Sequence, residues 1–149
     1  MSNQRLELFR QYIGQRMVNG FSPMGTWLAG KLLDVHEGAL TVSFDVRKEM
    51  TNPAGILHGG AAAAMLDEIM GVTVYLLNQA DFYASVNLSI DYLASAREGD
   101  EIIGRTRVIR AGRRIINIEG WLESSSGERL VKATSNLVAA PKFNGTDRA

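Results

Sequence analysis

The segment that most constrains the fold is residues 59–77, an apolar stretch whose only charged side chains are Asp67 and Glu68. Two glycines and four alanines open it, and the alanines favour helix. A helix that is apolar nearly all round has no polar face to give to water, so the rest of the chain must cover it. The sequence therefore predicts a long, buried central helix.

The segments before and after this helix alternate with the two-residue period of β-strands. The apolar positions of the first strand are Leu40, Val42, Phe44 and Val46. The apolar positions of the second are Ala84, Val86, Leu88, Ile90 and Tyr92. We expect the opposite face of the second strand to carry Ser85, Asn87, Ser89 and Asp91. Further strands are predicted over residues 26–36, 101–110, about 116–122 and 129–139.

The N-terminal segment has a different period. Its apolar residues recur at near-helical spacing and predict an amphipathic helix over residues 3–18. The chain shows no internal repeat and no linker, so its 149 residues predict a single domain. One antiparallel sheet curled around the apolar central helix accommodates this order of elements, which is an α+β architecture.

Composition excludes several classes of function. The 16 basic and 16 acidic residues balance, so nothing indicates a nucleic acid or an anionic membrane as partner. The chain has no cysteine and only two histidines, so we expect no metal and no cofactor. No apolar stretch reaches the ~18–20 residues of a membrane span. The N-terminus also lacks the apolar run of a signal peptide, and we expect a cytoplasmic protein.

The start of the central helix has the features of an anion site. The N–H groups of a first helical turn have no partner within the helix, and the helix dipole favours negative charge there. Glycines such as Gly59 and Gly60 let a ligand approach those groups closely. Asp67, two turns further on, is costly to bury unless it has a task or a partner. Together these features predict a site that stabilises an oxyanion and handles a proton or a water molecule.

This motif resembles that of the PaaI-type acyl-CoA thioesterases, which have the hotdog fold. Their signature is an Asn, a Gly, a His-Gly-Gly triplet and then an acid about two helical turns later. In this chain the signature reads Asn52, Gly55, His58-Gly59-Gly60 and Asp67. The order of elements matches from about residue 25 to residue 140. The resemblance implies an antiparallel sheet wrapped around a long central helix, and hydrolysis of an acyl-CoA thioester.

The resemblance also implies catalytic roles. The Gly59 N–H helps to polarise the thioester carbonyl, Asp67 acts as general base or nucleophile, and Asn52 orients the substrate or the water. Ser85, at the start of the next strand, matches a Ser or Thr that often supports the water. His58 either contacts the substrate or only braces the helix start.

One position departs from the family pattern. Many relatives have a histidine two residues before the Asn, where this chain has Met50.

Other residues are expected to bind the substrate. Gly60 and Glu68 lie beside the motif residues, although Glu68 could instead be structural. Arginine suits phosphate geometry, and family members often bind the nucleotide of coenzyme A near a hairpin that here carries three arginines. A solvated turn is the alternative for these residues, Arg110, Arg113 and Arg114. The pocket for an aryl or medium-chain acyl group could be lined by Met24, Trp27, Met65, Met70 and Tyr75.

Helix geometry predicts a site shared between subunits. At ~1.5 Å rise per residue, Gly59 and Asp67 lie ~12 Å apart along one helix, too far to act readily on one carbonyl. If both act on one thioester, Gly59 of one subunit must meet Asp67 of another, and the resemblance implies a homodimer or homotetramer. The central helix and the edge of strand 83–93 could form this contact. The apolar neighbours of Asp67 on the helix should desolvate its carboxylate and strengthen it as a base.

Two alternatives remain open at this point. The first is a hydratase or dehydratase acting on acyl thioesters, but His58 and Asp67 lack the spacing usual in those enzymes. The second is a non-catalytic module that binds acyl-CoA; the intact acid and His-Gly-Gly argue against it, whereas Met50 favours it. A Ser-His-Asp hydrolase is not favoured, because no serine lies on a nucleophile elbow.

Overall fold

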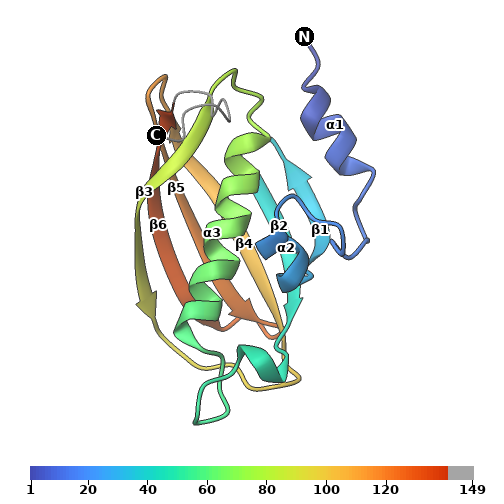
Figure 1. Cartoon of the computed structure of the whole chain (residues 1–149), viewed down its shortest axis with the longest axis vertical. Coiled ribbons are helices and arrows are strands. Elements are labelled where there is room, and N and C mark those ends of the chain that lie inside the picture. Colours follow the sequence, from blue (N-terminus) through green and yellow to red (C-terminus); the bar gives the residue numbers. More distant parts are fainter. Residues whose placement is uncertain (141–149) are drawn as a thin grey trace, which may run out of the picture.

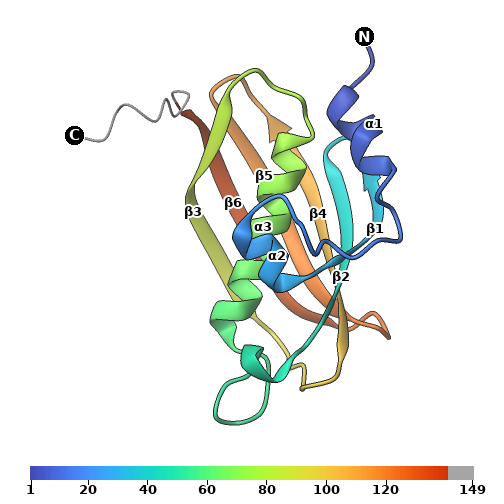
Figure 2. The ribbon, with the colours of Figure 1, turned by 45° about the vertical axis from the view of Figure 1, so that its right-hand side comes forward.

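The central helix of the computed structural model is α3 (Gly59–Tyr75), and a six-stranded antiparallel sheet wraps around it (Figure 1). The strand order is β1-β2-β4-β5-β6-β3, and Figure 2 shows the sheet curving about the helix. The strands are β1 (Lys31–His36), β2 (Ala39–Asp45), β3 (Phe82–Tyr92), β4 (Glu101–Ala111), β5 (Ile115–Ser124) and β6 (Arg129–Ala140). This arrangement confirms the predicted α+β architecture.

The structure describes residues 1–140, and residues 141–149 of the predicted domain lie outside them. Within the described part, no helix has both the length and the apolar character needed to cross a membrane.

The N-terminal segment forms two short helices, α1 (Gln4–Arg10) and α2 (Pro23–Leu28), so the predicted helix over residues 3–18 is too long. The chain leaves α1 through Gly14, whose φ of +87° suits glycine, and Met17 N–H then donates to the carbonyl of Gly30 next to β1. Pairing with the sheet thus replaces the last turns of the predicted helix. A capping serine and a proline at the first helical position start α2, and its last residues, 26–28, overlap the predicted strand 26–36.

One face of α3 packs on the concave side of the sheet. Glycines on the strands leave room for this packing, since a Cβ at Gly104 would lie 2.8 Å from Ile69 Cδ1 and one at Gly120 2.9 Å from Met70 Cε. The buried residues of this face of α3 are Ala62, Met65, Leu66, Ile69, Met70, Val72, Thr73 and Val74.

The other face of α3 is only partly covered, so the predicted burial on all sides does not hold in the single chain. Its small residues Ala63, Ala64 and Gly71 are half-buried, and Asp67 is exposed. The sheet curls around one side of the helix and leaves this stripe beside the edge strand β3, which among the described residues pairs only with β6.

A buried pair of threonines fixes α3 on the sheet. Thr73 Oγ1 of α3 donates to the carbonyl of Ile69 and lies 2.6 Å from Thr106 Oγ1 of β4. Thr106 Oγ1 also accepts from the backbone N–H of Leu40 in β2, at 3.0 Å. The helix and two strands therefore share one chain of hydrogen bonds inside the core.

Strand β3 contains a β-bulge that changes which side chains face α3. Ser85 pairs with Leu137 and Asn87 with Asn136, so Val86 has no partner. Directly opposed residues of an antiparallel pair lie on the same face of the sheet, and Leu137 is buried against the helix side. Ser85 therefore faces α3.

The predicted alternation along residues 84–92 is consequently wrong in its first half. Leu88 is paired with the buried Ser135 and also faces α3, so Ser85 and Leu88 share a face. Ala84, expected on that face, pairs instead with Val138 on the other. The extra residue Val86 shifts the two-residue period by one position.

Thr106→Val tests the buried hydrogen-bond chain. The substitution keeps the volume but leaves the Leu40 N–H without its acceptor and Thr73 without its donor. We expect the free energy of unfolding to fall by about 1–3 kcal/mol, measured by urea denaturation. The matched control is Thr134→Val on the exposed face of β6, which should change it by less than about 0.5 kcal/mol. Equal effects of the two substitutions would contradict this account.

Candidate active site

The start of α3 is held by three hydrogen bonds. His58 is the N-cap residue; its Nδ1 accepts from the Gly60 N–H at 2.8 Å, and its own N–H donates to the carbonyl of Met50 at 2.8 Å. Tyr92 Oη, from the end of β3, donates to the carbonyl of Gly59 at 2.8 Å. Within residues 1–140 the Gly59 N–H makes no hydrogen bond, so it is available to a ligand.

Glycine at position 59 allows the tyrosine to lie over the helix start. A Cβ there would be 3.1 Å from both Cζ and Oη of Tyr92, tighter than ordinary van der Waals contact. Gly59 and Tyr92 both line a pocket of about 220 Å³, together with Asn52. Tyr92 was predicted only as an apolar position of its strand, and its contact with the helix start was not.

Asn52 shapes the loop that leads into α3. Its Oδ1 accepts from the N–H groups of Ala54 at 2.9 Å and Ile56 at 3.3 Å, the pattern of an Asx turn. Gly55 completes this loop with a φ of +75°. The motif Asn and Gly thus have a conformational reason for their identities, and a role of Asn52 in orienting substrate or water stays a prediction.

Position 50 is not part of the site surface. The Met50 side chain is 1% exposed and lies in the core cluster, while its carbonyl holds the His58 N–H. The residue that replaces the family's histidine therefore contributes apolar packing and a backbone acceptor.

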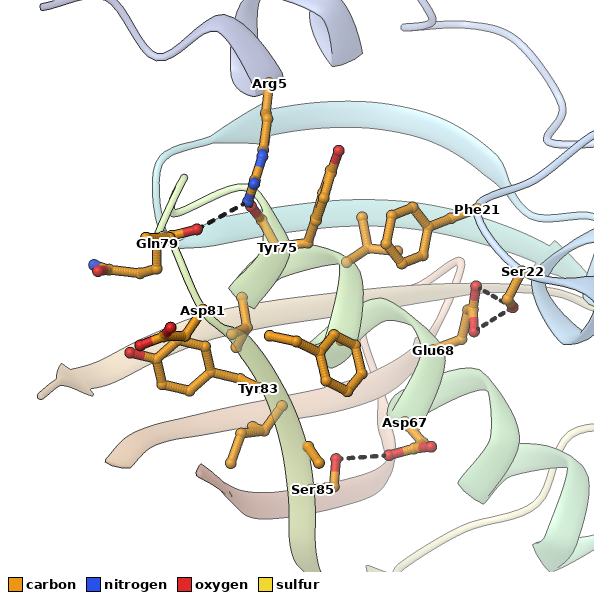
Figure 3. A pocket seen from close by; sticks show the side chains of 17 residues that line it. Arg5, Phe21, Ser22, Asp67, Glu68, Tyr75, Gln79, Asp81, Tyr83 and Ser85 are labelled. Atoms are coloured by element: carbon orange, nitrogen blue, oxygen red, sulfur yellow. Dashed lines mark hydrogen bonds between the residues drawn. The ribbon is translucent and has the colours of Figure 1, made fainter. Parts of the chain in front are cut away.

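Asp67 and Ser85 form the second group of candidate residues. Ser85 Oγ donates to Asp67 Oδ1 at 3.3 Å, and both line a pocket of about 530 Å³ between α3 and β3. Figure 3 shows this pair at one end of the pocket and Arg5 at the other. The structure thus brings together the two residues that the motif assigned to water activation.

The expected desolvation of Asp67 is absent in the single chain, where the side chain is exposed. The reason is its position on the stripe of α3 that the sheet leaves uncovered. Removing this carboxylate from water would require a surface beyond residues 1–140 of the single chain.

Glu68 has a structural task. Ser22 Oγ donates to both carboxylate oxygens of Glu68, at 2.8 and 2.9 Å, and itself accepts from the Gly25 N–H at the start of α2. The acid therefore holds α2 against α3. It also lines the 530 Å³ pocket, so its predicted contact with substrate stays a prediction.

The 530 Å³ pocket shares little with the set of residues predicted to line an acyl pocket. Of the predicted side chains only Tyr75 lines it; Met65 and Met70 are buried against the sheet, and Met24 and Trp27 are exposed on α2. Three other aromatic residues line it, and periodicity did not reveal them: Phe21, Phe82 and Tyr83.

The upper wall of the pocket is an aromatic and cationic stack. The Phe21 and Tyr75 rings lie 4.7 Å apart, and the Arg5 guanidinium lies 4.3 Å above the Tyr75 ring.

The three arginines of the β4–β5 hairpin are exposed. Arg113 and Arg114 line an open pocket of about 560 Å³ that also includes Asp81. The Tyr83 hydroxyl donates to the Arg113 carbonyl at 2.9 Å, which places this hairpin beside the start of β3. Gly59 lies beside the opposite end of β3, at Tyr92.

The candidate residues therefore form two groups within one chain. Gly59, Asn52 and Tyr92 surround one pocket, and Asp67 and Ser85 line another. Along α3 the two groups are separated by about two turns, or ~12 Å. Within a single subunit, the Gly59 N–H and the Asp67 carboxylate are therefore too far apart to act on the same thioester carbonyl.

Comparison with known proteins identifies the family. Residues 54–131, more than half of the chain, match the model of the thioesterase superfamily. The chain belongs to this superfamily. Acyl-coenzyme A thioesterase 13 of Homo sapiens is 28% identical over 108 residues, which are 72% of this chain and 72% of the relative.

Solved structures agree with this assignment. A phenylacetic acid degradation-related protein from Ralstonia eutropha JMP134 is 28% identical with a TM-score of 0.72, covering 83% of this chain and 96% of that one. A Streptococcus pneumoniae thioesterase protein crystallised with coenzyme A is 22% identical with a TM-score of 0.71, covering 74% and 85%. The predicted hotdog fold is confirmed, and the protein is a thioester hydrolase.

The variants Glu68→Gln and Glu68→Ala distinguish a structural role of this residue from a catalytic one. Glutamine still offers an oxygen to Ser22, so we expect near-wild-type thioester hydrolysis and stability. Alanine removes both acceptors and should lower the free energy of unfolding by about 1–3 kcal/mol. A large loss of turnover in the glutamine variant, with its unfolding unchanged, would show instead that the charge of Glu68 takes part in the reaction.

Proposed function

We propose that this thioesterase hydrolyses an aryl- or medium-chain acyl-CoA to the free acid and coenzyme A, with Asp67 as general base or nucleophile. The observation that carries the proposal is the Asp67–Ser85 pair at the end of an aromatic-lined pocket. The human relative is an acyl-coenzyme A thioesterase, and the Streptococcus protein was crystallised with coenzyme A, which supports the same substrate class here.

The pair has the geometry of a supported base. Ser85 Oγ donates to Oδ1, which leaves Oδ2 of Asp67 free to accept a proton from water as the water oxygen attacks the thioester carbon. In the nucleophilic alternative the carboxylate attacks the carbon itself, and water then cleaves the resulting anhydride. In both routes the C–S bond breaks, and the thiolate of coenzyme A leaves and takes up a proton.

The Gly59 N–H supplies the oxyanion donor. It points out of the first turn of α3, where the helix dipole also favours negative charge. A donor fixed in advance stabilises the charge that develops on the carbonyl oxygen at little reorganisation cost. His58 and Tyr92 hold this turn from both sides, and Gly60 and Asn52 would contact the substrate beside it.

The two groups act together in a site shared between subunits. The exposed edge of β3 and the small-residue stripe of α3 are continuous with Asp67, and a two-fold pairing would present each subunit's Gly59 to the other's Asp67. The same contact would remove Asp67 from water and strengthen it as a base. The working form is then a homodimer, or a homotetramer built from such dimers.

The remaining surfaces suit the two ends of the substrate. Aromatic rings around the 530 Å³ pocket offer stacking and apolar contact to an aryl or medium-length acyl group. Arg110, Arg113 and Arg114, without carboxylate partners among the described residues, would bind the phosphates of coenzyme A. With such an intracellular substrate, the protein would act in the cytoplasm.

Asp67→Asn is the direct test of the mechanism. The amide keeps an oxygen for Ser85 but cannot accept the proton from water, so kcat should fall by about 10²–10⁴-fold while the fold is retained. Release of free thiol from a panel of aryl- and alkyl-CoA esters measures this, and the chain adds no thiol of its own because it has no cysteine. Turnover near that of the wild type would refute the role of Asp67.

Mixed dimers test the shared site. Gly59→Pro removes the oxyanion N–H, and proline is tolerated at the first position of a helix, as Pro23 is in α2. The proline Cβ requires the Tyr92 ring to move by a few tenths of an ångström, so retention of the fold is checked first. Alone, this variant and Asp67→Asn should both be nearly inactive. Refolded together, they should regain activity, because each mixed dimer pairs an intact Gly59 with an intact Asp67. Failure of properly folded mixed dimers to regain activity would contradict a shared site.

A further inference from the structure

The bulge in β3 places Ser85 opposite Asp67, and a specific set of contacts holds this bulge. In a regular strand with Leu88 facing α3, the two-residue period would turn Val86 toward the helix and Ser85 away from it. Instead Val86 is unpaired and 60% exposed, and Ser85 takes the position facing α3. The hydrogen bond to Asp67 therefore exists only in the bulged pairing.

Asn87 anchors the bulge from the outer face of the sheet. Its side-chain Oδ1 accepts from the backbone N–H of Asn136 at 2.8 Å and from the Asn136 side-chain amide at 3.3 Å. A backbone N–H of this kind ordinarily pairs with a carbonyl of the neighbouring strand, and a bulge disrupts that pairing. The Asn87 side chain thus replaces a main-chain acceptor that the bulge displaces.

A second contact anchors the same residue from the inner face. Ser135 Oγ donates to the backbone carbonyl of Asn87 at 2.8 Å, and Ser135 is 1% exposed. Without this contact the buried hydroxyl would lack a partner, which is costly. On the outer face, Asn117 Nδ2 donates to Asn136 Oδ1 at 3.0 Å and steadies the Asn136 amide. Asn87 is therefore held on both faces of the sheet.

We propose that Asn87 is a positioning residue for catalysis: it stabilises the bulged register of β3, and so keeps the Ser85 hydroxyl on Asp67. This inference rests on the proposed role of Asp67 as base or nucleophile. Asn87 itself touches neither Asp67 nor the reacting atoms; it acts through the conformation of the strand.

A double-mutant cycle tests the proposal. Ser85→Ala should lower kcat about tenfold, the effect of one hydrogen bond to a charged group, with KM little changed. Asn87→Ala should lower kcat by a similar factor through the same lost contact. The kcat of the double variant should then lie within about twofold of that of either single variant, because both substitutions remove the same interaction. Independent, multiplicative losses would overturn the proposal.

Conservative variants separate positioning from general stability. Asn87→Asp keeps an Oδ acceptor for the Asn136 N–H and should restore most of kcat, whereas Asn136→Ala keeps that backbone N–H and should change kcat little. If Asn87→Ala does not fold, Ser135→Ala replaces it in the cycle, since it removes the inner anchor. Lack of rescue by aspartate in a folded protein would overturn the claim that the acceptor oxygen matters.

The outcomes also separate this inference from the proposed function. If Asp67→Asn is inactive but the Ser85 and Asn87 effects are independent, the mechanism stands and the positioning role fails. If Asp67→Asn is active, the proposed function fails first. A Ser85→Ala enzyme with unchanged kcat would refute the positioning role whatever the result at Asp67.

Discussion

The packing of one face of α3 on the sheet is the constraint on which the rest of the structure depends. Burying this face removes a large apolar area from water, and glycines at 104 and 120 let the helix come close enough to do so. The Thr73–Thr106 contact then fixes the helix along its axis, because a shift would break buried hydrogen bonds. The positions of Gly59 and Asp67 relative to the strands follow from this one packed contact.

The same contact explains why the chemistry lies on the other face. A helix packed through large side chains on one side can carry small residues and an acid on the other, where the sheet does not reach. Asp67 stays hydrated in the single chain and avoids the cost of an isolated buried charge. The start of the helix is exposed for the same reason. His58 and Tyr92 hold the turn that carries the Gly59 N–H through their hydrogen bonds.

The sequence predicted those features that local chemistry determines. The central helix begins at Gly59, as the glycine and alanine pattern indicated, and His58 caps it. Ser22-Pro23 carried the signal for α2, but only a break was predicted there, with a strand from residue 26 onward. The bulge at Val86 left no such signal, since residues 84–92 alternate without interruption; the pairing with β6 creates it. Nor could periodicity reveal Tyr92 at Gly59 or Phe21 beside Tyr75, because each contact joins segments distant in the sequence.

The bulge also shows how an edge strand can combine a regular outer edge with a local change of register. Within residues 1–140 the outer edge of β3 is unpaired. In the proposed dimer this edge would face another subunit, which favours a regular strand, whereas the Asp67 contact needs one residue out of register. On the β6 side of the bulge, the Asn87 side chain accepts from the Asn136 N–H, and the Ser135 hydroxyl donates to the Asn87 carbonyl. Regular pairing resumes at Leu88 and continues to Tyr92, so the strand can align Tyr92 with the helix start while Ser85 remains on Asp67.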